Sequence, residues 1–243
     1  MRLDDVWLRY GRGPWILRGI TATLGAGEVA AVVGRNGAGK STLLQVVAGL
    51  LRPNKGTVSG WPARVGYVPE RFPADQPFTA RHYLTSLARV RGDRADGLAE
   101  WAERLHFTGL LDRPLGQLSK GSAQKVGLLQ AMLAEPDLLI LDEPWEGLDG
   151  PTREQVPVIF EEVLAAGGRV LISDHQGQTS DLPGLRRWDL SAGGLHETDA
   201  DADAGWVVVE VAVEASAADE AVVTFEAAGH EVLNVRGRRR ERA

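Results

Sequence analysis

The sequence contains no cysteine, which excludes disulfide bonds and thiolate metal sites. No stretch approaches the roughly 18 consecutive apolar residues that cross a bilayer, so any role at a membrane would require binding to another chain. Residues 1–13 carry acidic side chains early and lack an apolar segment, so no secretory signal is expected there. The net charge is −6, and this lack of a basic excess argues against a nucleic-acid partner.

The length and composition suit one globular domain, or one domain and a smaller addition. The chain has 243 residues, of which 44% are hydrophobic and 25% are charged. These fractions are ordinary for a folded protein and argue against wholesale disorder. A chain of this length can bury a large core.

The first part of the chain has the pattern of strands followed by a loop and a helix. Residues 1–33 predict short strands with a turn at 11–14, and the apolar run 28–33 predicts a buried strand that ends at Gly34. After a glycine-rich loop, apolar residues at helical spacing predict a helix over 40–51.

The middle of the chain predicts a helical insert over about residues 71–135. Thr79 is a candidate cap for a helix that ends near Gly92, residues 98–105 suggest a second helix, and Ser119 is a candidate cap for a third. Beyond the insert, strands are expected at 138–141 and 170–173, with a helix over 151–166 that must accommodate Pro157. This order predicts an α/β fold with a mainly parallel sheet and flanking helices, after an antiparallel N-terminal β part.

The composition changes near residue 198. Residues 198–205 are acidic and small, and are expected to link a main domain (1–197) to an appendage (206–243). In the appendage, residues 206–213 and 231–235 predict strands, and the helix between them would begin at a capping box over 216–219. The sequence therefore predicts a small β-α-β unit that ends in a basic tail.

A glycine-rich segment matches the phosphate-binding loop pattern G-x-x-x-x-G-K-[ST]. Glycines allow backbone N–H groups to approach phosphate oxygens, and the following helix start adds partial positive charge. A lysine here reaches the β- and γ-phosphates of ATP, and the next hydroxyl ligates Mg²⁺. The simpler alternative is a glycine-rich turn with a surface lysine. The candidate residues are Gly34, Arg35, Asn36, Gly37, Ala38, Gly39, Lys40, Ser41 and Thr42.

A second segment supplies carboxylates. The apolar run 138–141 ends in Asp142 and Glu143, 102 residues after Lys40. A carboxylate at the C-terminal edge of a parallel strand can lie beside the phosphate loop, so Asp142 is a candidate ligand for Mg²⁺. Glu143 is a candidate general base that polarises the attacking water.

The segment Leu118-Ser-Lys-Gly-Ser122 resembles the signature motif of ATP-binding cassette (ABC) proteins, usually Leu-Ser-Gly-Gly-Gln. Ser119 and Gly121 match that motif, 23 residues before Asp142, whereas Lys120 and Ser122 depart from it. The resemblance implies a P-loop NTPase core whose signature motif contacts the γ-phosphate of ATP held by a partner subunit.

Four further residues fit the resemblance. It implies that Tyr10 stacks on adenine, that Glu70 meets Mg²⁺ or its water where most members have Gln, and that His175 bonds the γ-phosphate. The resemblance also implies that Asp149 lies in a segment that crosses the dimer interface, although a simple helix cap is the alternative for it. Trp145 and Glu146 depart from the residues commonly found before that segment.

The resemblance implies an ATP hydrolase that works with ATP and Mg²⁺ as a pair of subunits, with a homodimer expected. Its other partner would be a polytopic membrane permease, and its location the cytoplasmic, inner face of the cell membrane. The segments that contain Glu70 and Lys120 resemble the forms found in exporter ATPases, so export is expected rather than import. Two alternatives stay open: a non-transport ATPase acting on ribosomes or DNA, and a weakly hydrolysing regulatory partner.

Overall fold

The computed structural model describes residues 1–92, 95–174, 179, 182–199 and 218–227. The chain divides into two compact units, 1–203 and 204–243. In the second unit the described residues form the helix α6 (Ala218–Ala227). The helical part of the expected appendage is therefore present. Its expected strands, its basic tail and the capping box lie wholly or mainly outside the described residues.

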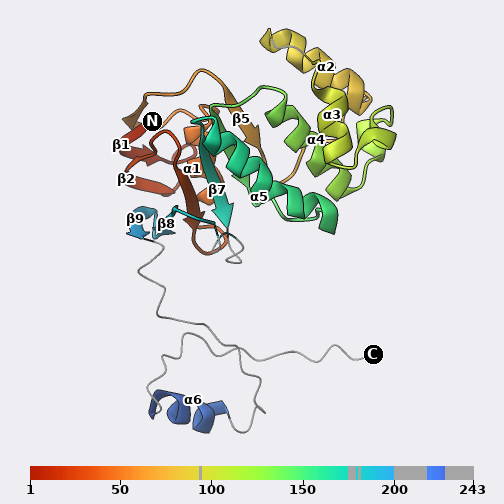
Figure 1. The fold of residues 1–243 in the computed structure, drawn as a ribbon. Coiled ribbons are helices and arrows are strands. Elements are labelled where there is room, and N and C mark those ends of the chain that lie inside the picture. The colour runs from red at the N-terminus through yellow and green to blue at the C-terminus, as the bar shows by residue number, and fades with distance from the viewer. Residues whose placement is uncertain (93–94, 175–178, 180–181, 200–217, 228–243) are drawn as a thin grey trace. The chain divides into compact units, whose positions relative to one another are not determined.

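The described part of the first unit is an α/β structure (Figure 1). Its strands are β1 (Arg2–Leu8), β2 (Leu17–Thr23), β3 (Val29–Val33), β4 (Lys55–Ser59), β5 (Val65–Val68), β6 (Leu138–Asp142), β7 (Arg169–Asp174), β8 (Leu185–Ser191) and β9 (Gly194–Asp199). Its α-helices are α1 (Lys40–Val47), α2 (Ala80–Arg91), α3 (Leu98–Arg104), α4 (Lys120–Met132) and α5 (Gly150–Ala165). Short 3₁₀ turns, η1 (Thr108–Leu110) and η2 (Leu115–Gln117), join α3 to α4.

The main sheet has the strand order β5-β6-β7-β3-β8-β9. Its first five strands are parallel and β9 is antiparallel to β8. The carboxyl ends of β3, β6 and β7 therefore meet at one edge of the sheet, where parallel α/β folds place their ligands. A separate antiparallel sheet has the order β2-β1-β4 and contains the N-terminal strands expected from the sequence.

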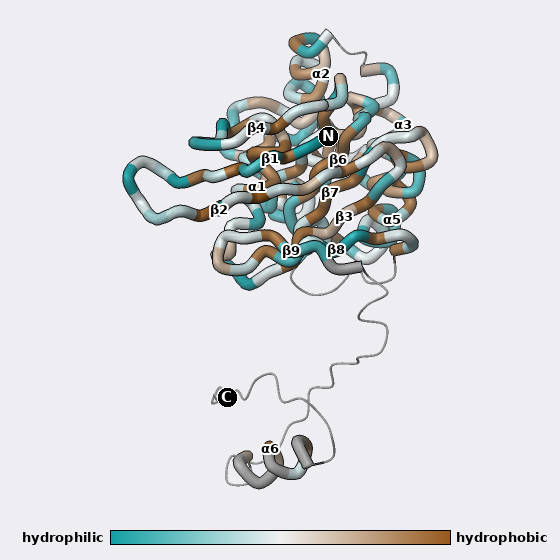
Figure 2. Tube along the Cα trace, turned by 90° about the vertical axis from the view of Figure 1, so that its left-hand side faces the viewer, coloured by the Kyte–Doolittle hydropathy of each residue, from teal (hydrophilic) through white to brown (hydrophobic). Residues whose placement is uncertain are grey.

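Two apolar layers cover the two faces of the main sheet. On one face, α1 and the small antiparallel sheet pack on the side chains of Ala30, Val32, Ile140 and Leu171. On the opposite face, α5 and the helical insert, which includes α4, pack on neighbouring residues of the same strands. Figure 2 shows β3, β6 and β7 as hydrophobic, as expected for strands that are buried on both faces.

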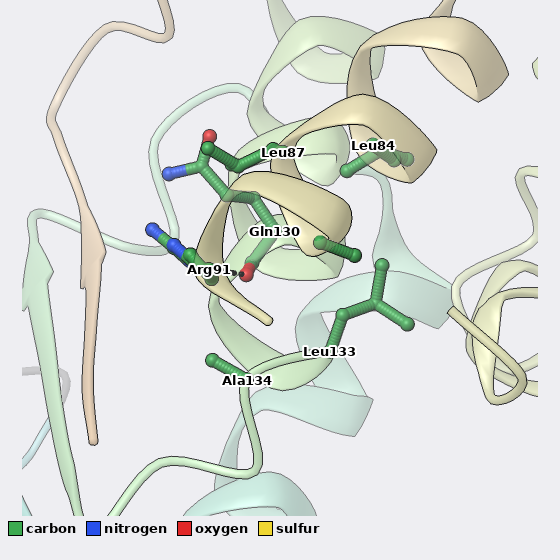
Figure 3. Close-up of a pocket in the computed structure, with 7 residues that line it drawn as sticks. Leu84, Leu87, Arg91, Gln130, Leu133 and Ala134 are labelled. Carbon is green, nitrogen blue, oxygen red and sulfur yellow. Dashed lines mark hydrogen bonds between the residues drawn. The ribbon is translucent and has the colours of Figure 1, made fainter. Parts of the chain in front are cut away.

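The helices α2, α3 and α4 pack together on one side of the sheet and form the expected insert (Figure 1). Thr79 caps α2 by accepting a hydrogen bond from the backbone of His82, and Gly92 ends that helix in a left-handed conformation. A small pocket lies between α2 and α4, where Arg91 donates to the carbonyl of Gln130 at 3.3 Å (Figure 3). None of the candidate ATP-binding residues lines this pocket.

Several sequence expectations about element boundaries were wrong. Helix α1 ends at Val47 rather than near residue 51, because Gly49 takes a left-handed conformation just beyond it. Strands β8 and β9 were not expected, and β9 extends to Asp199, so residues 198 and 199 lie in a strand rather than in a linker. Helix α5 continues through Pro157.

Among the described residues, no helix is both long and apolar enough to span a membrane.

Candidate active site

The glycine-rich loop joins the end of β3 to the start of α1. Three glycines of this loop have positive backbone φ angles, which residues with a side chain rarely adopt: 154° at Gly34, 80° at Gly37 and 105° at Gly39. A Cβ atom on Gly34 would lie 2.5 Å from the carbonyl oxygen of Leu190, and one on Gly39 would lie 2.8 Å from a methyl carbon of Ile16. Both positions therefore require glycine. The exposed segment between them consists of Arg35, Asn36 and Gly37.

Lys40 turns its side chain back into this loop. Its ammonium group donates to the carbonyl of Gly34 at 3.0 Å and lies 3.6 Å from Oε1 of Glu143. The side chain is only 6% exposed. A buried cation is costly unless it is paired, so this arrangement holds a positive charge where an anion can replace part of its present contacts.

The carboxylates lie at the ends of β6 and β7. Asp142 pairs with Ser173 in the register of these strands, and the Ser173 hydroxyl donates to Oδ1 of Asp142 at 2.6 Å. The same hydroxyl accepts the backbone N–H of Glu143 at 2.8 Å. Glu143 has a φ of 50°, which is strained for a non-glycine residue. Ser173 therefore holds both acidic residues, a role that sequence reasoning did not assign to it.

Ser41 and Thr42 follow Lys40 in the first turn of α1. The hydroxyl groups of Tyr10 and Thr42 lie 3.4 Å apart, and Tyr10 is about half exposed. The structure thus brings Tyr10 to the phosphate loop, with its ring available to a planar ligand. Tyr67, on β5, has an enclosed hydroxyl near this edge. Burial, and then the charge of Asp142, raise the pKa of Tyr67 to about 12, so it stays neutral.

The signature segment lies at the start of α4, away from the phosphate loop of its own chain. Ser119 caps α4 by accepting the backbone N–H of Ser122 at 3.2 Å. Gly121 packs closely against Gly147. A Cβ atom on Gly121 would lie only 2.1 Å from the Gly147 carbonyl oxygen, so this contact requires glycine. Within the described residues, no hydrogen bond joins Ser119 or Gly121 to residues 34–42.

Asp149 has contacts within its own chain. It caps α5 by accepting the backbone N–H of Thr152 at 3.0 Å, and it pairs with the buried Lys125 at 2.7 Å. The bond to Lys125, followed by the bonds to Thr152, lowers the pKa of Asp149 to about 2. The helix cap that the sequence left open as an alternative is thus present, and a contact with nucleotide across a dimer stays a prediction.

The last two candidates are less defined. Glu70 follows β5 and is half-exposed, with Arg71 at 4.0 Å from its carboxylate. A role for Glu70 at a metal stays a prediction. His175 lies outside the described residues, directly after the end of β7. Asp174 before it accepts hydrogen bonds from the backbone and the hydroxyl of Thr179.

Comparison with known proteins decides the family. The family described as ABC transporter matches residues 17–146, which include the glycine-rich loop, the signature segment and the two carboxylates. The chain belongs to the ABC transporter family. It is an ATP-binding subunit of that family and an ATP hydrolase.

Individual relatives support this assignment. A zinc import ATP-binding protein, ZnuC, of Cereibacter sphaeroides is 40% identical over 168 residues, which cover 68% of each chain. The protein of the same name in Paramagnetospirillum magneticum is 40% identical over 178 residues, which cover 72% of this chain and 67% of that one. The matched segment of a third, from Halorhodospira halophila, spans 57% of that relative.

Solved structures show the same fold. An ATP-binding subunit of an ABC transporter aligns with a TM-score of 0.75 at 26% identity and covers 83% of this chain and 90% of that one. A dimeric ATP-binding cassette with bound ADP and Pi aligns with a TM-score of 0.71 at 21% identity, over 82% and 98% of the two chains.

The exporter-like interpretation of the sequence is not supported. The relatives carry names of import proteins, although this ABC subunit has the Glu70 and Lys120 variants that suggested export.

Proposed function

We propose that this ABC subunit works as one half of a head-to-tail pair that drives a separate, polytopic membrane permease. Each ATP would lie between the phosphate loop of one copy and the Ser119–Gly121 segment of the other. The pair acts at the cytoplasmic face of the cell membrane. The names of the relatives, which are zinc import proteins, support uptake as the direction and a metal ion as the class of substrate.

One observation carries this proposal: Lys40, Asp142 and Glu143 converge at one edge of the sheet. Lys40 Nζ lies 3.6 Å from Glu143, and Ser173 joins Asp142 to the backbone of Glu143. A cation for the phosphates, a carboxylate for a metal and a carboxylate for water are the parts that phosphoryl transfer requires. The adjacent backbone of the glycine-rich loop supplies N–H donors for the same anion.

Mg²⁺ fits the residues present. The Ser41 hydroxyl and the Asp142 carboxylate offer oxygen ligands only, which is the donor type that Mg²⁺ prefers. When bound, the ion would neutralise charge on the phosphate oxygens. Ser173 orients the Asp142 carboxylate through its 2.6 Å hydrogen bond, and Glu143 would accept the proton of the attacking water.

The second copy is proposed because, among the described residues, no hydrogen bond joins the signature segment of one chain to its own phosphate loop. Ser119 and Gly121 stand at the start of a 13-residue helix, where N–H groups and the helix dipole favour an anion. Ser119 bonds Ser122, and Gly121 packs against the turn around Gly147. A facing copy would place its own ATP phosphates there.

Purification with membrane partners tests the transport role. A tagged chain, extracted in detergent, is expected to retrieve a polytopic protein that stimulates ATP hydrolysis. Retrieval of ribosomes or DNA instead would favour the non-transport alternative. Cells that carry the intact chain and this permease should accumulate radiolabelled zinc, and cells with Lys40→Ala should not. Efflux of the label would contradict uptake.

Ser119→Arg is expected to abolish ATP hydrolysis, because its side chain would block the γ-phosphate of the facing copy. Lys40→Ala should also abolish it, since the phosphates lose their cation. A mixture of the two inactive variants should regain turnover, because a mixed pair contains one site with both Lys40 and Ser119 intact. Equal mixing gives about half mixed pairs with one working site each, or about a quarter of wild-type turnover at most.

Thr79→Arg is the matched control for Ser119→Arg. It removes the N-cap of α2 just as Ser119→Arg removes that of α4, at a similar cost of about 1 kcal/mol in stability. The control should hydrolyse ATP normally. Normal turnover by Ser119→Arg, or a mixture that stays inactive although the two variants form mixed pairs, would contradict the shared site.

A further inference from the structure

Two departures from the usual motifs meet in the structure. Lys120 replaces a glycine of the signature motif, and Glu146 stands before the segment that ends at Asp149. They are 26 residues apart in sequence, yet Nζ of Lys120 donates to Oε1 of Glu146 at 2.7 Å. Each unusual residue is therefore the partner of the other.

The Lys120–Glu146 ion pair lies beside a close backbone contact between Gly121 and Gly147. Gly121 packs against the carbonyl of Gly147, and Gly147 has a φ of 77° that favours glycine. The Lys120 stem lies against the same glycine, 3.7 Å from its Cβ position. One turn further along α4, Lys125 pairs with Asp149. The start of α4 is thus held to the segment 146–149 at three successive points.

This segment leads directly to the proposed catalytic base. The backbone N–H of Glu146 donates to the carbonyl of Glu143 at 3.1 Å, which closes a tight turn. The Glu143 carboxylate in turn lies 3.6 Å from the Lys40 ammonium. A continuous series of contacts therefore runs from Lys120 through Glu146 and Glu143 to Lys40.

Fold stability does not explain the pair. The Lys120 and Glu146 side chains are 46% and 41% exposed, and ion pairs this exposed contribute little to stability. Lys120 is also the first residue of α4, where the helix dipole disfavours a cation. Glu146 offsets that charge. A positive charge kept at this helix start and tied to the turn after Glu143 indicates a role in the reaction.

We propose that Lys120 and Glu146 are positioning residues that couple the two ATP sites of a pair. This inference rests on the proposed function, in which the signature segment of one copy contacts the ATP of the other. A shift of that segment would pass through the Lys120–Glu146 pair to the turn that carries Glu143. Each copy would thus position its own Glu143 when the ATP held by the other copy contacts its signature segment. The two sites would then hydrolyse ATP cooperatively.

Charge reversal tests the coupling. Lys120→Glu and Glu146→Lys each place like charges at this contact, and the double variant restores opposite charges. Each single variant is expected to lower kcat by about fivefold or more and to bring the Hill coefficient for ATP to about 1. The double variant should recover most of the wild-type kcat and most of the wild-type Hill coefficient. Arg81→Glu is the matched control, since it reverses one charge of the exposed ion pair between Arg81 on α2 and Asp112.

Binding of a fluorescent ATP analogue to the separate chain, and the melting temperature, should stay at wild-type values in all four variants. Single variants with wild-type kcat and cooperativity would overturn the coupling. A double variant as poor as Lys120→Glu alone would also overturn it, and would show that Lys120 acts on phosphate directly. If the wild-type chain itself shows no ATP-dependent pairing, the proposed function fails, which is a distinct result.

Discussion

Glu143→Gln is expected to retain ATP but to slow its hydrolysis by about 100-fold or more. The amide has the shape of the carboxylate, so the turn after β6 and the strained backbone at Glu143 should persist. The amide cannot accept a proton from water, and it also loses the ionic contact with Lys40 at 3.6 Å. ATP should therefore stay bound, and the ATP-bound pair should accumulate.

Phosphate release measures the turnover, and light scattering with size-exclusion chromatography in ATP measures pairing. Glu154→Gln makes the same chemical change at an exposed position of α5 and should behave as wild type. Turnover at the normal rate in Glu143→Gln would show that another group is the base. Loss of ATP binding would instead indicate that the ion pair with Lys40 is needed to form the site.

Gly34→Ala should reduce ATP affinity far more than Gly37→Ala. Both glycines have positive φ, so alanine costs on the order of 1 kcal/mol of backbone strain at each position. Only at Gly34 would the new Cβ overlap a backbone atom, the carbonyl oxygen of Leu190 at 2.5 Å, whereas Gly37 faces open space. A backbone clash is relieved only by moving the loop.

Displacement of the loop by about 1 Å can cost about 100-fold, because its N–H groups and Lys40 must meet the phosphates together. Titration with a fluorescent ATP analogue measures this loss, and melting curves separate it from unfolding. Gly37→Ala, with the same chemical change, is the control. Equal affinities in the two variants would mean that β8, which carries Leu190, does not constrain the phosphate loop.

Elements with strong local patterns were predicted well from the sequence. The caps Thr79 and Ser119, the strand that ends at Asp142 and the glycine-rich loop before α1 are all found where their residues indicated. In each case, neighbouring residues contain the requirement: a hydroxyl before a helix, an apolar run, or glycines at positive φ. The ABC resemblance rested on these same segments, and the family match confirms it.

Strand β8 was missed because its sequence hides its burial. Arg186 and Arg187 are adjacent and Asp189 follows Trp188, so the segment shows neither a continuous apolar run nor a regular alternation, yet Trp188 is fully buried against the core. The strand is recognisable only from its place beside β3, with which it pairs in parallel over five residues. Its end also supplies the Leu190 carbonyl that restricts Gly34.

Ser173 and the Lys120–Glu146 pair were missed for a related reason. Ser173 lies at the end of the expected strand 170–173, but its role depends on its register against Asp142 in the neighbouring strand. Lys120 and Glu146 were each recognised as departures from a motif. Nothing in the sequence indicated that they touch, because the contact joins the start of α4 to the turn after β6.

The sequence alone determined the phosphate loop, its lysine and the two adjacent carboxylates, because each depends on a short run of neighbouring residues. Only the tertiary structure decided how Lys40, Glu143 and Ser173 meet, and that Lys120 is tied to the turn beyond Glu143. The contact of Ser173 depends on the register of strands far apart in the chain, which follows from the packing of the whole sheet between its two apolar layers. The contact of Lys120 depends on the packing of α4 against the turn after β6.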